Sequence, residues 1–95
     1  MKVEIEALQE TYVILGCDGG EVLNRIMDAG EAERAKCDSV IRVSAADAGA
    51  VRVSVNGFTC QPLGDAGTRA FGYTIRVDDY ARICPSTERG TDARP

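Results

Sequence analysis

The chain carries four cysteines, and their spacing bears directly on the chemistry that it can support. They stand far apart, at Cys17, Cys37, Cys60 and Cys84. Structural zinc sites bring their ligands in pairs separated by two to four residues, so this spacing argues against a metal site. An even number of well-separated cysteines in a small domain is typical of a disulfide framework, although cysteine is also an ordinary small core residue. Both interpretations remain open from the cysteines alone.

Catalytic side chains are scarce. The chain has no histidine, which excludes a Ser-His-Asp or Cys-His arrangement within it and removes the commonest general base. Glu4 and Glu6 alternate along one strand pattern, and Asp78 and Asp79 end another, so solubility and edge protection explain these carboxylates. The Asp-Gly-Gly at 18–20 lacks the Lys-Ser/Thr of a phosphate loop and predicts a turn. We expect no enzyme and no catalytic, cofactor or metal site.

Length and charge limit the size of the core and the kinds of partner that the chain can bind. The 95 residues fit one domain, which should bury roughly 65% of its unfolded surface. Since aromatic residues make up 5% of the chain and tryptophan is absent, the core must be mostly aliphatic. The net charge of -4 argues against nucleic-acid binding, which needs a basic stripe. Arg42, Arg52 and Arg76 could line one polar strand face, but a solvated face with acidic neighbours is the simpler interpretation.

Alternating apolar and polar residues predict a chain of short strands. The clearest case is 51–55, where three valines alternate with Arg52 and Ser54 and are followed by the turn-forming Asn56-Gly57. Strands are expected near residues 2–7, 12–17, 23–27, 33–37, 41–45, 51–55 and 71–77. Short strands separated by turns favour an all-β fold, a small seven-stranded and mostly antiparallel β-sandwich.

The register of these strands predicts which side chains are buried. The expected core consists of Val13, Leu15, Ile41, Val43, Val53, Val55, Tyr73 and Ile75. Tyr12 and Phe58 lie outside or at the end of the inward register, so they are the candidates for a protein-binding surface.

The segment 21–36 is ambiguous. Strong helix formers fill its second half, and Val22, Ile26 and Ala29 stand at helical spacing. Gly30 argues against one long helix. From the residues alone, helix and strand remain equally open.

The order of the turns and strands resembles one family. An Ala-Gly-Ala turn at 48–50, the valine strand, Asn56-Gly57, and Pro-Leu-Gly at 62–64 with Gly67 follow one another. Upstream come Tyr12, the Asp-Gly-Gly turn and Ala-Gly-Glu at 29–31. This order resembles the extracytoplasmic C-terminal domain of RodZ, the bacterial cell-shape protein, over roughly residues 2–79. Ala35, where the family usually has an aromatic residue, and the four cysteines depart from the family pattern.

The resemblance implies a fold assignment and a function. It implies strands in 21–36, a β domain at 1–83 and a flexible tail at 84–95. It implies a non-catalytic extracytoplasmic interaction module of a membrane-anchored bacterial protein, whose single N-terminal span and helix-turn-helix domain lie outside this chain. Its partners would be proteins of the cell-shape or envelope-synthesis machinery. No apolar stretch of this chain approaches the ~20 residues needed to cross a bilayer.

An extracytoplasmic setting favours disulfides over free thiols. If the second, third and fourth strands run up, down and up, Cys17 and Cys37 finish at the same end of the sandwich. That arrangement favours Cys17 with Cys37 and leaves Cys60 with Cys84, the second pair depending on how the chain returns after the last strand.

A second class of function remains possible. A small β-sandwich could hold carbohydrate or cell-wall fragments on one face, and such a module needs exposed aromatic rings beside polar groups. The candidates for these rings are Tyr12, Phe58 and Tyr80.

Overall fold

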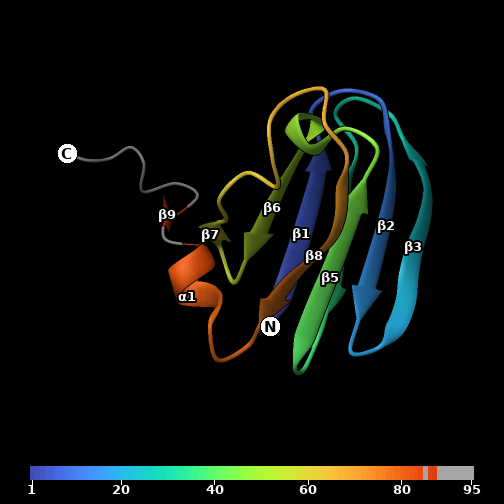
Figure 1. Cartoon of the computed structure of the whole chain (residues 1–95). Helices are drawn as coiled ribbons and strands as arrows, with labels where there is room; N and C mark the ends of the chain where they lie inside the picture. The colour runs from blue at the N-terminus through green and yellow to red at the C-terminus, as the bar shows by residue number, and fades with distance from the viewer. Residues whose placement is uncertain (85, 88–95) are drawn as a thin grey trace.

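The computed structural model describes residues 1–84 and 86–87 and shows two antiparallel sheets packed as a sandwich (Figure 1). One sheet has the order β4-β1-β6-β7, with the two-residue β9 added at its edge, and the other has the order β3-β2-β5-β8. The strands are β1 (Lys2–Ala7), β2 (Thr11–Cys17), β3 (Gly20–Met27), β4 (Ala32–Lys36), β5 (Val40–Ala45), β6 (Val51–Val55), β7 (Phe58–Thr59), β8 (Ala70–Arg76) and β9 (Ser86–Thr87).

The all-β sandwich expected from the sequence is confirmed. All seven expected strands are present, and β7 and β9 are additional two-residue strands. Two short helical segments, η1 (Ala48–Ala50) and α1 (Tyr80–Ile83), precede β6 and follow β8. Of the tail expected at 84–95, residues 85 and 88–95 lie outside the described part of the chain.

The ambiguous segment 21–36 forms two strands, so its helical alternative is wrong. β3 and β4 are joined by a turn in which the Glu31 amide donates to the Asp28 carbonyl at 3.0 Å and Gly30 takes a φ of 90°. Leu23 and Met27 are buried between the sheets. Burial of these side chains outweighs a helix propensity that amounts to tenths of a kcal/mol per residue, about 0.7 kcal/mol at most for ordinary residues.

The core matches the register expected from the sequence. Seven of the eight expected residues are buried: Val13, Leu15, Ile41, Val43, Val53, Val55 and Ile75. Tyr73 lies opposite Val43 and packs against the core, but it is only half-buried. Because β8 is an edge strand, the Tyr73 hydroxyl reaches the rim of the sandwich, where it donates to the Gln61 carbonyl at 3.4 Å.

The turns carry the backbone conformations that their residues favour. Asn56 and Gly57, with φ of 53° and 86°, join β6 to β7 in a tight reversal. Gly49 lies in η1, where a Cβ atom would stand 2.5 Å from Ala66 Cα, so only glycine fits. Asp47 accepts hydrogen bonds from the amides of Gly49 and Gly67, which anchors the loop 62–69 to the end of the sandwich.

Candidate functional site

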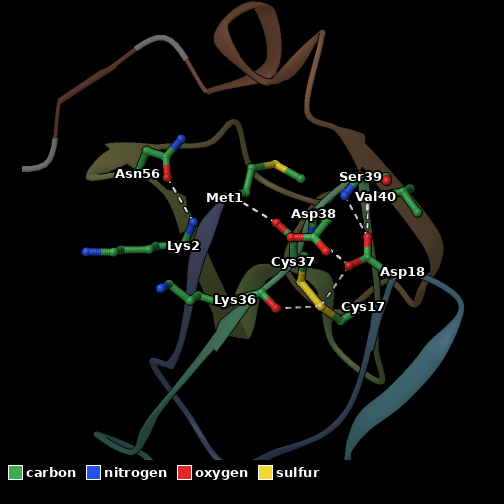
Figure 2. Close-up of a disulfide and its surroundings, with 10 residues drawn as sticks. All are labelled: Met1, Lys2, Cys17, Asp18, Lys36, Cys37, Asp38, Ser39, Val40 and Asn56. Atoms are coloured by element: carbon green, nitrogen blue, oxygen red, sulfur yellow. Dashed lines mark hydrogen bonds between the residues drawn. A yellow bond between two sulfur atoms is a disulfide. The ribbon is translucent and has the colours of Figure 1, made fainter.

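The first disulfide joins Cys17 to Cys37, as the strand directions predicted, with the Cα atoms 5.4 Å apart (Figure 2). Cys17 ends β2 in one sheet, and Cys37 follows β4 in the other. Cys37 is fully buried, whereas Cys17 is only half-buried. The bond therefore ties the two sheets together at one end of the sandwich.

Asp18 organises the turn beside this disulfide. Its carboxylate accepts hydrogen bonds from the amides of Asp38 and Ser39, both at 2.6 Å, and of Val40 at 3.1 Å (Figure 2). These three backbone donors hold the pKa of Asp18 below its usual value. The carboxylate thus fixes the link from Cys37 into β5, and its role is structural.

The second disulfide joins Cys60 to Cys84, so the other expected pair is also confirmed. Cys60 follows β7, and Cys84 caps α1 with its amide donating to the Tyr80 carbonyl. Both half-cystines are buried. Cys84, placed by the sequence at the start of the tail, thus connects α1 to the sheet that contains β7.

All four cysteines are engaged in disulfides. Within residues 1–84 and 86–87, no group of three or more His, Cys, Asp or Glu side chains is placed to hold a metal ion. Two disulfides suggest an oxidising, extracytoplasmic setting, because thiols in the cytosol are kept reduced. None of the helices in the described part of the chain is long and apolar enough to cross a membrane.

The two aromatic candidates for a binding surface lie on different sheets. Tyr12, in β2, is 43% exposed, and its hydroxyl donates to the side-chain oxygen of Asn24. Phe58, in β7, is half-buried against the core, with its ring centroid 6.4 Å from that of Tyr80. The structure does not bring Tyr12 and Phe58 together into one patch.

Phe71 is the exposed aromatic residue that the sequence did not identify. Simple alternation placed Phe71 in register with Tyr73 and Ile75, but its side chain is 87% exposed. The pairing of β5 with β8 shifts by one residue, since Val43 lies opposite Tyr73 whereas Ala45 lies opposite Ala70. This β-bulge turns Phe71 outward, and Gly72, with a φ of 68°, provides the required backbone conformation. Gly72 within the strand pattern was the available signal.

The three arginines that could have shared one polar face are divided between the sheets. Arg42 and Arg76 lie on the outer side of β5 and β8, while Arg52 lies on β6 and forms an ion pair with Glu6. Of these three arginines, Arg52 alone forms an ion pair within the described part of the chain, and Arg76 lies in the field of Asp79.

The outer side of the sheet β3-β2-β5-β8 is hollowed at two adjoining places, of about 270 and 520 Å³. Both are lined by Ile14, Ser44 and Phe71; Tyr12 lines the first and Arg42 the second. This surface brings together exposed apolar side chains and a cation.

No protein-family model, curated protein or solved structure matches this chain.

Proposed function

We propose that this chain is a non-catalytic extracytoplasmic interaction module of a RodZ-like, single-span bacterial envelope protein. It binds protein partners of the cell-shape or envelope-synthesis machinery. The order of turns and strands supports the family assignment, and the two disulfides support the location.

One observation supports the binding role most strongly. Exposed apolar side chains gather on the outer side of the sheet β3-β2-β5-β8, including Tyr12, Ile26 and Phe71. Antiparallel sheets in sandwiches normally present polar residues to water, and contiguous apolar patches on a surface mark interaction sites.

Two experiments test this proposal, one on the upstream gene sequence and one on cell shape. The codons upstream of Met1 should encode an apolar span of about 20 residues preceded by basic residues. Deleting the codons for residues 1–84 from the chromosomal gene should change cell width or roundness in micrographs. A matched strain carrying Arg34→Gln, on the opposite sheet, should keep normal shape. Normal morphology after the deletion, or no upstream span, would refute the proposal.

A carbohydrate-binding module is the second candidate. Tyr12 and Phe71 expose rings on one side of a sheet beside Asn24 and Arg42, and sugars stack on ring faces between polar groups. Calorimetric titration with soluble cell-wall muropeptides distinguishes a carbohydrate-binding module from the first candidate. Saturable heat that is lost in Phe71→Ser would favour this second function.

A further inference from the structure

The outer side of the sheet β3-β2-β5-β8 carries an apolar row that the polar Ser44 interrupts on β5. Four of the six exposed large hydrophobic residues among those described lie on it, and half-buried Ile14 connects them. We call this surface the exposed sheet face; its apolar members are Tyr12, Ile14, Val22, Ile26 and Phe71.

The row runs from β3 through β2 to Phe71 of β8, and β5, which lies between β2 and β8 in Figure 1, contributes the polar Ser44 instead of an apolar side chain. Tyr12 lies directly opposite Ile26 of β3, and Ile14 lies directly opposite Ser44 of β5. The Ser44 hydroxyl accepts a hydrogen bond from the Gly72 amide at 2.9 Å, next to Phe71 of β8. Strands are spaced about 4.8 Å apart, so the row is roughly 14 Å long. An extended segment of about five residues spans that length.

Two polar groups of this face, the Tyr12 hydroxyl and the Asn24 amide, are held in place before any partner arrives. Tyr12 is bonded to Asn24, whose side-chain amide donates to the Glu21 carboxylate at 3.0 Å. Arg42 lies between two glycines: a Cβ atom on Gly16 would meet Arg42 Cβ at 3.7 Å, and one on Gly72 would meet its guanidinium at 3.4 Å. Prior ordering of such groups lowers the entropy cost of binding.

The arginines of the two outer faces differ in their ion pairing. On the sheet that contains β1, Arg34 pairs with Glu4 at 3.3 Å, and Arg52 pairs with Glu6. On the exposed sheet face, Arg42 and Arg69 form no ion pair within the described part of the chain, and Arg76 lies in the field of Asp79, which Arg82 already pairs. Glu21 is the acidic residue lining the hollows. Lys2 and Lys36, on the opposite outer face, also form no ion pair among the described residues, but β1, β4 and β6 carry no exposed large hydrophobic side chain there. Of the two outer faces, the exposed sheet face is thus the one where unpaired cations border an apolar row.

These charges also argue against a second copy as the occupant. A two-fold interface through this face would place the arginines of one copy near those of the other, and like charges at an interface are costly. A partner carrying carboxylates would instead complement Arg42 and Arg69.

We infer that the exposed sheet face binds an extended protein segment in which carboxylates alternate with apolar side chains. The apolar residues of the segment pack along Tyr12, Ile14 and Phe71, and its carboxylates meet Arg42 and Arg69. This inference rests on the proposed function, because it specifies the partner of the same surface.

A defined peptide tests the inference on the purified, oxidised chain. The probe is a blocked eight-residue peptide that alternates glutamate with leucine and phenylalanine, and the matched peptide has lysine at each glutamate. We expect backbone amide NMR shifts on adding the first peptide to concentrate in β2, β5 and β8. The lysine peptide should bind at least about tenfold more weakly, and Arg42→Gln and Phe71→Ser should each weaken the first peptide about tenfold.

Arg34→Gln, on the opposite outer face, is the matched control and should bind as the unchanged chain does. Arg42→Gln changes only an exposed side chain, so its effect on binding can be measured even if Phe71→Ser disturbs folding. Shifts on the sheet that contains β1, equal binding of the lysine peptide, or no binding of either peptide would overturn the inference. A dimer in sedimentation that Phe71→Ser abolishes would also overturn the inference. Binding of muropeptides without binding of either peptide would overturn it as well.

The two proposals can fail separately. Peptide binding with normal cell shape after deletion refutes the cellular role and leaves this surface assignment standing. Altered cell shape without peptide binding refutes this surface assignment and leaves the cellular role standing.

Discussion

At the scale of single residues, Asp18 joins the two chain segments at the disulfide end of the sandwich. It follows Cys17 directly, takes a positive φ of 53°, and bonds three amides of the strand connection that follows Cys37. Two carboxylate oxygens share these three donors, with Val40 and Ser39 on one oxygen and Asp38 on the other. An asparagine would point an NH₂ group at one of these donors.

Asp18→Asn should therefore lower the urea midpoint of unfolding at neutral pH. Since the folded-state pKa of Asp18 lies below its ordinary value of 3.8, its stabilisation is present above that pH and is lost as the pH falls through the lowered pKa. The midpoints of the two proteins should converge in acid. Asp38→Asn is the control, because the Asp38 side chain forms no hydrogen bond within residues 1–84 and 86–87 and should leave the midpoint unchanged. A constant difference between Asp18→Asn and the unchanged chain at every pH would contradict this account.

At the scale of elements, the bulge in β8 decides which aromatic ring faces the solvent. Gly72 has a φ of 68°, a conformation that costs a residue with a Cβ atom about 1–2 kcal/mol. Gly72→Ala should accordingly lower the unfolding free energy by about 1–2 kcal/mol, measured by urea titration. The new methyl would lie 3.4 Å from the Arg42 guanidinium, which can move aside.

Gly16→Ala is the matched control for Gly72→Ala. Gly16 flanks Arg42 on the other side, has no positive φ, and offers a Cβ atom only ordinary contacts at 3.7 Å. We expect no loss of stability there, because alanine also restricts the unfolded chain. Equal losses at the two positions would show that backbone strain at the bulge is not the cause.

The bulge also marks the limit of what the sequence could predict. Period-two alternation identifies β1 and β5 because each has one buried and one more exposed face, and it identifies β6 by its valines, although Ser54 there is also buried. It fails where a register shift changes the face, as between Val43 and Ala45, since one extra residue reverses every side chain beyond it. Tyr12 was correctly placed outside the core, whereas Phe71 was not. Because of that single residue, the sequence did not predict the exposed sheet face.

The segment 21–36 illustrates a second limit. Its helix propensity and its strand pattern are both real, and local sequence does not choose between them. The choice is made by contacts with β1 and β2, to which β4 and β3 pair over their whole lengths. The contacts of β4 with β1 are long-range and those of β3 with β2 form a hairpin, so both depend on residues outside the segment.

At the scale of the whole molecule, the two disulfides hold different parts of a thin sandwich. Cys17–Cys37 connects the sheets beside β2, and Cys60–Cys84 connects the strand after β6 to α1. Among residues 1–84, no aromatic side chain is fully buried in the aliphatic core between the sheets. We therefore expect the cross-links to contribute a large share of the stability.

Removing the disulfides should reveal that share. The bonds close loops of 20 and 24 residues in sequence separation, and the chain-entropy relation assigns roughly 3 kcal/mol to each. We expect Cys17→Ala with Cys37→Ala to lower the unfolding free energy by about 3 kcal/mol in one cooperative transition, since that bond joins both sheets. Cys60→Ala with Cys84→Ala should lower it by a similar amount and release α1 from protection against amide exchange before the strands open.

Loss of both bonds should cost about 6 kcal/mol, which is comparable to the total stability of a domain of this length, roughly 5–14 kcal/mol. Urea titrations of oxidised protein and of reduced, alkylated protein, followed by far-UV circular dichroism, measure the difference, and mass spectrometry of an unreduced digest verifies the pairs. Alkylated protein that unfolds at the same urea concentration as the oxidised form would show that the sandwich core suffices alone. A large fall in the midpoint would instead establish that the domain depends on an oxidising setting to fold.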